Sequence, residues 1–162
     1  MNKILFIDIE IEVQSKKVLD IGCISNSGEQ FHSPSVTKFF QQISGTDYLC
    51  GHNIIHHDLH YLKRLGKFDF SAMRAIDTLY ISPLLFPKEP YHKLLKDDKL
   101  QSEELNNPLN DAMKARDLFY DELTAFNKLD EDLMQIYFGL LESKAEFASF
   151  FAYMANSFFG VL

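Results

Sequence analysis

Hydrophobic and polar residues alternate in blocks that predict three strands at the start of the chain. An apolar run from Lys3 to Ile9 and a run of strand-forming residues from Val18 to Ser25 are separated by the polar stretch Glu12 to Lys17, a pattern typical of a β-hairpin. A third strand is predicted near Glu29 to His32, because Asn26-Ser27-Gly28 before it suits a tight turn. We therefore expect three antiparallel strands first.

The next segments alternate between helical and strand patterns. Pro34 to Ile43 has apolar residues at the spacing of a helix with one buried face, and Tyr48 to Cys50 suits a short strand. A second helix is predicted from Asp58 to its closing Gly66. Ala75 to Leu79 predicts a further strand or the entry to a helix, with Asp77-Thr78 suited to a cap.

Prolines and polar residues separate this region from a later helix. We expect Pro83, Pro87 and Pro90 to break regular structure, and residues 97–110 to form a long connection with room for one short helix. Helical spacing returns from Asp111 to Phe126. Strands first, then alternating strands and helices, then helices, favour an α/β fold with a mixed sheet covered by helices.

The last 34 residues have a different composition. Residues 129–162 predict two helices dense in aromatic side chains. The apolar part from Glu146 is shorter than the roughly 20 residues that a membrane span needs, and it contains Ser149 and Asn156. We expect no membrane span. The prediction is a domain over residues 1–128 and a helical extension over 129–162, which packs on that domain or leads to a further one.

Composition limits the classes of function. The chain has 162 residues, 46% of them hydrophobic, which suits one compact domain. A net charge of −7 argues against a protein that coats nucleic acid by electrostatics alone, but not against an enzyme whose carboxylates bind metal. Cys23 and Cys50 lie in apolar contexts and are expected to be free thiols in a reducing cytoplasm. Asp8 interrupts the first apolar run before a signal-peptide core could form.

Acidic residues stand at the starts and ends of three predicted elements. Asp8-Ile9-Glu10 ends the first strand, and a spacing of two puts both acids on one face of the sheet. Two close carboxylates repel each other unless a cation lies between them, although a solvated strand end with two acids is also common. Asp58 and Asp111 each lie in the first turn of a predicted helix, where an acid also favours the helix N-terminus.

Together these segments resemble the three motifs of the DEDD superfamily of 3′-to-5′ exonucleases, which includes polymerase proofreading subunits and oligoribonucleases. The D-x-E motif matches Asp8 and Glu10, and the G-H-N-x-x-x-F-D-x-x-x-L motif matches Gly51 through Leu62 with Asp58 as its acid. The motif H-x-x-x-x-D-A matches the stretch that ends at Asp111-Ala112. The resemblance covers about residues 3 to 126. It implies a ribonuclease-H-like fold with a five-stranded mixed sheet.

The resemblance also implies a site and a reaction. Two divalent ions, Mg²⁺ or Mn²⁺, would be held by Asp8, Glu10, Asp58 and Asp111 for the hydrolysis of a phosphodiester at a 3′ end. The terminal nucleotide would contact the backbone around Ile9 and Ile11, together with His52 and Asn53. The expected partner is a single-stranded or 3′-ended nucleic acid, and DNA is favoured over RNA. A helicase or polymerase, fused to the chain or associated with it through the C-terminal helices, is a further expected partner.

The chain departs from the family pattern at the general base. The family has a His five residues before the last Asp, or a Tyr four before it, and here Asn106 and Asn107 occupy these positions. Neither amide takes up a proton at neutral pH, although Asn106 could aim a water, and the upstream His92 could substitute or be a surface residue. We expect a slowed exonuclease. The alternative is a degenerate module that binds metal, nucleic-acid ends or a partner protein without efficient catalysis.

A histidine cluster suggests a second kind of metal site. His52, His56, His57 and His60 lie close in sequence, and His56 and His60 would share one helical face. The segment lacks the glutamate of H-E-x-x-H, and a third ligand has no obvious source. Zinc is therefore the weaker hypothesis, and the histidines are expected on the surface of the helix, with His57 at the aromatic position before the motif acid.

Overall fold

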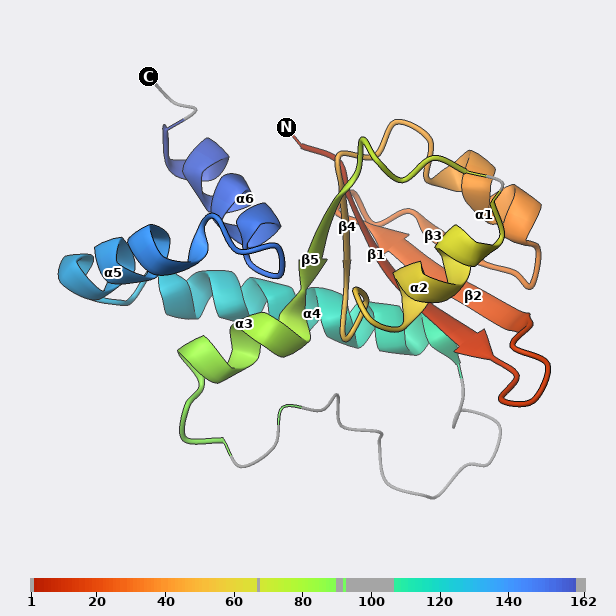
Figure 1. Cartoon of the computed structure of the whole chain (residues 1–162), viewed down its shortest axis with the longest axis horizontal. Coiled ribbons are helices and arrows are strands. Elements are labelled where there is room, and N and C mark those ends of the chain that lie inside the picture. The colour runs from red at the N-terminus through yellow and green to blue at the C-terminus, as the bar shows by residue number, and fades with distance from the viewer. Residues whose placement is uncertain (1, 67, 90–91, 93–106, 160–162) are drawn as a thin grey trace.

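A five-stranded mixed sheet forms the centre of the molecule (Figure 1). The computed structural model describes residues 2–66, 68–89, 92 and 107–159. The strands are β1 (Ile4–Ile11), β2 (Val18–Ser25), β3 (Gln30–His32), β4 (Tyr48–Gly51) and β5 (Arg74–Asp77). Their order is β3-β2-β1-β4-β5; the first three pair antiparallel, whereas β4 pairs parallel with β1 and with β5. The predicted ribonuclease-H-like sheet, with three antiparallel strands first, is confirmed.

Helices cover both faces of this sheet. One face carries α1 (Val36–Gln42) and α2 (Asp58–Arg64), whose buried residues share a core with β1 and β2. The other face carries α3 (Thr78–Leu85), α4 (Pro108–Phe126) and α6 (Ala148–Phe159), and the partly buried side of α5 (Glu131–Leu141) packs against the same core. Figure 1 shows α4 running along the sheet beneath β1 and β4.

Alternation along β1 decides which core each side chain joins. Leu5 and Ile7 are buried in the core under α1 and α2, whereas Phe6 is buried in the core shared with α4 and α6. Because side chains alternate along a strand, Asp8 and Glu10 continue the series of Phe6. Both acids therefore lie on the α4 face, and their spacing had predicted that they share one face.

The segment around residue 77 forms both of the elements that its sequence allowed. β5 ends at Asp77, and α3 begins at Thr78 with Asp77 as its N-cap. The prediction that Pro83 breaks regular structure is wrong, because Pro83 lies inside α3. Its missing N–H costs one helical hydrogen bond, while its neighbours Ile81 and Ser82 are fully buried and anchor the helix.

The long helix α4 begins three residues earlier than its apolar spacing indicated. Asn107 is the N-cap, and its side-chain oxygen accepts a hydrogen bond from the Leu109 N–H at 3.0 Å. Pro108 follows at the first helical position, where a missing N–H costs nothing. Of the connection predicted over residues 97–110, residues 97–106 lie outside the described part of the chain.

The C-terminal helices pack on the sheet. Phe150, Phe151 and Met154 of α6 are buried in the core that also contains Ile4 and Phe6 of β1. Two helices were expected in this region, and α5 and α6 are found. Among the described residues, no helix combines the length and the apolarity that crossing a bilayer requires. The division of the chain at residue 128 stays a prediction.

Both cysteines are buried free thiols, as their apolar sequence contexts indicated. Burial raises the pKa of Cys23 to about 12 and that of Cys50 well above its ordinary value. The thiolate is the reactive form of cysteine, so both side chains act as small apolar core residues.

A buried carboxyl group connects α3 to α4. Glu122 of α4 is fully buried, and its Oε1 accepts a 2.7 Å hydrogen bond from the hydroxyl of Ser82 in α3. Its other oxygen, Oε2, is buried without a hydrogen-bond partner. Burial, with the nearby charge of Asp77 adding to it, raises the pKa of Glu122 from 4.5 to about 9. The protonated form therefore fits this position at neutral pH.

We expect Glu122 to make the protein less stable as the pH rises. Its pKa is raised in the folded state, so the folded protein binds the proton more tightly than the unfolded chain. The cost is absent below pH 4.5, grows between pH 4.5 and about 9, and is complete above that range. Urea unfolding of the wild type and Glu122→Gln at pH 6 and pH 9 checks this, because the Gln amide keeps an acceptor for Ser82 but does not titrate. Equal loss of stability in both proteins would contradict the assignment.

Candidate metal centre

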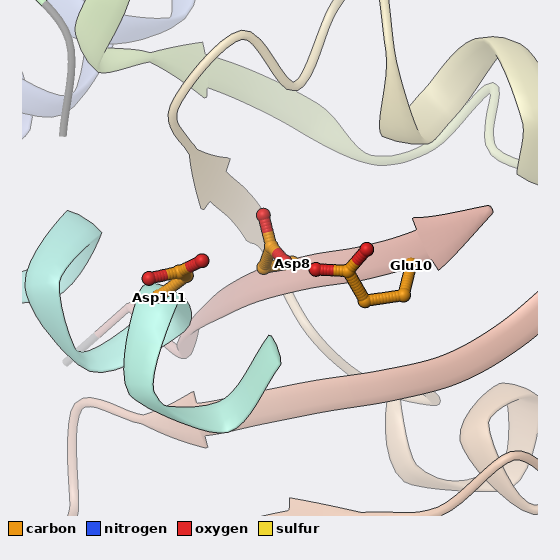
Figure 2. A group of neighbouring side chains, drawn as sticks. All are labelled: Asp8, Glu10 and Asp111. Carbon is orange, nitrogen blue, oxygen red and sulfur yellow. The ribbon is translucent and has the colours of Figure 1, made fainter. Parts of the chain in front are cut away.

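Three carboxylates from two distant segments of the sequence meet on the α4 face of the sheet, at β1. Asp8, Glu10 and Asp111 each offer one oxygen, and these oxygens all lie within 4.8 Å of one another. Figure 2 shows Asp8 and Glu10 side by side on β1, with Asp111 reaching toward Asp8 from the first turn of α4. All three side chains are half-buried, so the cluster is accessible from solvent.

The absence of a side chain at Gly22 lets α4 reach this position. Gly22 is the β2 residue paired with Asp8. A Cβ atom at Gly22 would overlap the backbone of Pro108 and Leu109 in the first turn of α4. The helix backbone therefore lies directly on the sheet beside Asp8, and this contact places Asp111 over the strand. A glycine inside a strand is a sequence signal for such a close backbone approach, but sequence reasoning did not use it here.

The donor set fits a hard divalent cation. Oxygen ligands around one Mg²⁺ stand about 2.1 Å from the ion, so neighbouring and opposite ligands are about 3 to 4.2 Å apart. The mutual limit of 4.8 Å for Asp8, Glu10 and Asp111 is close to this range, and small side-chain rotations would satisfy it. Carboxylates without Cys or His ligands favour Mg²⁺ or Mn²⁺ over zinc.

Asp58, the fourth predicted ligand, is not part of this group. Its carboxylate is buried, and Oδ1 accepts a hydrogen bond from the Ile9 N–H at 2.8 Å. β1 pairs with β4 as far as Phe6. Beyond that point, Asp58 provides the hydrogen-bond acceptor for the Ile9 N–H that β4 does not provide. In this structure Asp58 holds the peptide between Asp8 and Glu10. Its role as a metal ligand stays a prediction.

His57 lies beside Asp58 and completes its surroundings. The imidazole Nδ1 stands 3.6 Å from Asp58 Oδ2, and the His57 side chain is partly exposed. Burial raises the pKa of Asp58, and the neighbouring His57 opposes this shift. The pKa of His57 is raised in turn, mainly by its interaction with Asp58 and further by the charge of Glu10. The contact with Asp58 therefore favours the protonated form of the His57 imidazole.

The loop after β4 is held by the residues at the start of α3. Asp77 is fully buried, and its carboxylate accepts hydrogen bonds from the backbone N–H groups of Asn53 (2.8 Å), Ile55 (3.1 Å) and Leu79 (3.0 Å). Asn53 has a φ of 66°, a conformation that Asn adopts more readily than most residues. Sequence reasoning recognised Asp77 as a cap but not as the acceptor that fixes this loop.

His52 is held from both sides of its ring. Its Nε2 donates to the backbone carbonyl of His92 at 2.8 Å, so in the neutral ring Nδ1 accepts from the Thr78 hydroxyl at 2.8 Å. Burial lowers the pKa of His52, which favours this neutral form. The predicted contacts of His52, Asn53, Ile9 and Ile11 with a terminal nucleotide remain predictions.

Gly51 shows why the loop begins with glycine. A Cβ atom there would lie 2.8 Å from the carbonyl oxygen of Ile7, the residue before Asp8. The end of β4 therefore passes close to the strand that carries two of the three clustered acids.

The residues considered for the general base have different surroundings. Asn106 lies outside the described residues. The side chain of Asn107 is engaged as the N-cap of α4. His92 is half-buried, and its Nδ1 is buried without a hydrogen-bond partner, which differs from the exposed surface histidine that we considered.

The other histidines have ordinary neighbours in the fold. His56 shares a 2.6 Å hydrogen bond with the Tyr80 hydroxyl, and the rings of His57 and His60 each pack edge-on against Tyr61. Within the described part of the chain, no three histidines have ring nitrogens that all lie within 4.8 Å of one another, as the oxygens of Asp8, Glu10 and Asp111 do. The zinc hypothesis gains no support.

Comparison with known proteins supports the fold. No protein-family model matches the sequence. A search of curated proteins likewise found no match. Among solved structures, the chain is similar to the family B DNA polymerase of the hyperthermophilic archaeon Pyrobaculum calidifontis, with a TM-score of 0.57 and 15% sequence identity. The match covers 78% of this chain but 25% of the polymerase chain, so this chain corresponds to one part of that protein.

Proposed function

We propose that this chain is a metal-dependent exonuclease module that removes nucleotides from the 3′ ends of nucleic acids. The observation that carries the proposal is the convergence of oxygens from Asp8, Glu10 and Asp111 within 4.8 Å at an accessible position on one face of a ribonuclease-H-like sheet. The likeness of the fold to part of a DNA polymerase supports a nucleic-acid substrate.

The three clustered carboxylates would hold divalent cations, with Asp58 joining them as the fourth acid. Such ions supply two kinds of chemistry, a lowered pKa for an attacking water and neutralisation of charge on the leaving 3′ oxygen. The protein keeps its acids in register for this task. Asp58 fixes the peptide between Asp8 and Glu10, and the close packing of α4 on Gly22 fixes Asp111.

The terminal nucleotide would lie against the end of β1 and the loop after β4. The backbone of Ile9 and Ile11 would contact its sugar, while His52 and Asn53 would line the other side. Asp77 and Thr78 restrain that loop, so it would meet the substrate with little rearrangement. We propose DNA rather than RNA as the substrate. We also propose that residues 129–162 contact a fused or associated helicase or polymerase.

A second candidate function is a module that binds metal and nucleic-acid ends but cuts inefficiently. It is favoured by Asn107, which occupies one of the two general-base positions and whose side chain caps α4. General-base assistance is worth about 10² to 10⁴ in rate, so its loss slows a metal-driven reaction without abolishing it. The two candidates differ in turnover and share the same metal site.

Two differently labelled oligonucleotides test the proposal. With Mn²⁺, a single-stranded DNA labelled at its 5′ end should shorten in steps of one nucleotide, whereas the same DNA labelled at its 3′ end should release the label in the first step. A chelator should stop both reactions. Metal and oligonucleotide binding without shortening would favour the inefficient module, and shortening from the 5′ end would contradict the proposal.

A further inference from the structure

A lysine accompanies the acidic cluster on α4. Lys114 lies one turn beyond Asp111, and its Nζ stands 3.6 Å from Asp111 Oδ1. The side chain is 29% exposed, so most of its stem is covered while the ammonium group reaches the carboxylate. Sequence reasoning did not single out this residue. The i,i+3 spacing from Asp111 was the available signal.

The charges around the cluster explain what this lysine does in the metal-free protein. Three carboxylates whose oxygens lie within 4.8 Å of one another repel one another, and each favours a nearby cation. The ammonium of Lys114 supplies one positive charge at Asp111. A divalent ion that enters the cluster meets this charge, so Lys114 and the ion compete for the same carboxylate.

We infer that Lys114 is a substrate-binding residue that is paired with Asp111 in the metal-free site and binds the scissile phosphate once metal is bound. The inference rests on the proposed function and adds one residue to its site. Metal binding neutralises Asp111 and releases the ammonium. A phosphate group beside the cluster then offers a negative charge to this ammonium.

The chemistry and position of the side chain suit this second contact. Lysine carries a compact charge and three donors on a flexible stem, and it binds phosphate as a point charge. Lys114 also stands in the second turn of a 19-residue helix, whose positive N-terminal end favours anions nearby. If the pair of Lys114 and Asp111 were purely structural, replacing Lys114 would change neither the affinity for metal nor the binding of substrate.

Metal titration tests the first half of the inference. Calorimetry with Mn²⁺ alone should show that Lys114→Gln binds the ion about fivefold more tightly than the wild type, because a competing charge has been removed. Lys114→Arg keeps the charge and should stay near the wild type. Lys128→Gln, just past the end of α4, is the control and should leave the affinity unchanged.

Substrate binding and turnover test the second half. With saturating Mn²⁺, Lys114→Gln should bind a short single-stranded oligonucleotide more weakly, and its turnover should fall at least about tenfold. Tighter metal binding together with slower trimming is the result expected from a lysine that serves both states. If Lys114 were needed only for stability, replacing it with Gln would not tighten metal binding.

The outcomes separate this inference from the proposed function. If the wild type binds Mn²⁺ and oligonucleotide but never trims, the exonuclease proposal fails, and the two binding measurements still decide the role of Lys114. Unchanged or weaker Mn²⁺ binding in Lys114→Gln overturns the inference, as does unchanged oligonucleotide affinity. Should Lys114→Gln not fold, Lys114→Met, which keeps the apolar stem, is compared in the same way.

Discussion

Replacing Asp111 with Asn is expected to remove Mn²⁺ binding at the cluster and to lower trimming of DNA 3′ ends by about a thousandfold or more. The substitution keeps the size and shape of the side chain but removes one of three converging negative charges. Asp111 also comes from a different element than Asp8 and Glu10, so no carboxylate on β1 replaces it. Calorimetry with Mn²⁺ and a steady-state trimming assay measure the two effects.

Asp117→Asn is the matched control for this experiment. Asp117 lies on the same helix, its side chain is 66% exposed, and it pairs with its neighbour Arg116. The same chemical change there should alter neither metal affinity nor turnover by more than about twofold, because exposed ion pairs contribute little. If Asp111→Asn behaved like Asp117→Asn, the cluster would not be the metal site.

Gly22→Ala is expected to damage both the fold and the site. The added methyl group would overlap the backbone of Pro108 and Leu109, and backbone atoms at that contact cannot move aside as a flexible side chain can. We expect a loss of about 3 kcal/mol of stability, at the upper end of overpacking effects. In the molecules that still fold, α4 shifts away from β2, so Asp111 separates from Asp8, and Mn²⁺ affinity falls as well.

Urea unfolding and Mn²⁺ titration of Gly22→Ala measure these two losses. Gly139→Ala in α5 is the control, because a Cβ atom there meets nothing within 4 Å. The substitution also replaces a glycine inside a helix with a better helix former. That variant should keep its metal affinity and gain about 0.5 to 1 kcal/mol of stability. A Gly22→Ala protein with wild-type stability and metal affinity would show that α4 does not depend on this close contact.

The sequence was sufficient wherever a local pattern decides the structure. The run from Val18 to Ser25 forms β2 over those same residues, because its strand-forming residues suit a sheet that is buried on both faces. The spacing of Asp8 and Glu10 correctly put both acids on one face, since alternation along a strand is a local property. Their meeting with Asp111 followed from the family resemblance, and the structure shows how packing achieves it.

The remaining features depend on contacts between distant segments. Asp58 is buried against Ile9 because β1 continues beyond the point where its pairing with β4 ends. The two residues in this contact are about 50 positions apart in the sequence. The three hydrogen bonds of Asp77 likewise join two loops that come together only in the folded sheet. Pro83 was misjudged because helix propensity is a weak signal where neighbouring side chains are deeply buried.

The central place of β1 in the sheet has a consequence for how the site responds to thermal motion. Local opening fluctuations begin at termini, loops and edge strands, where few contacts hold the backbone. β1 is an inner strand with β2 on one side and β4 on the other, and it carries two of the three clustered carboxylates. Asp8 and Glu10 therefore lie in a part of the sheet that resists local opening, so partial opening at β3 or β5 should leave these two carboxylates in place.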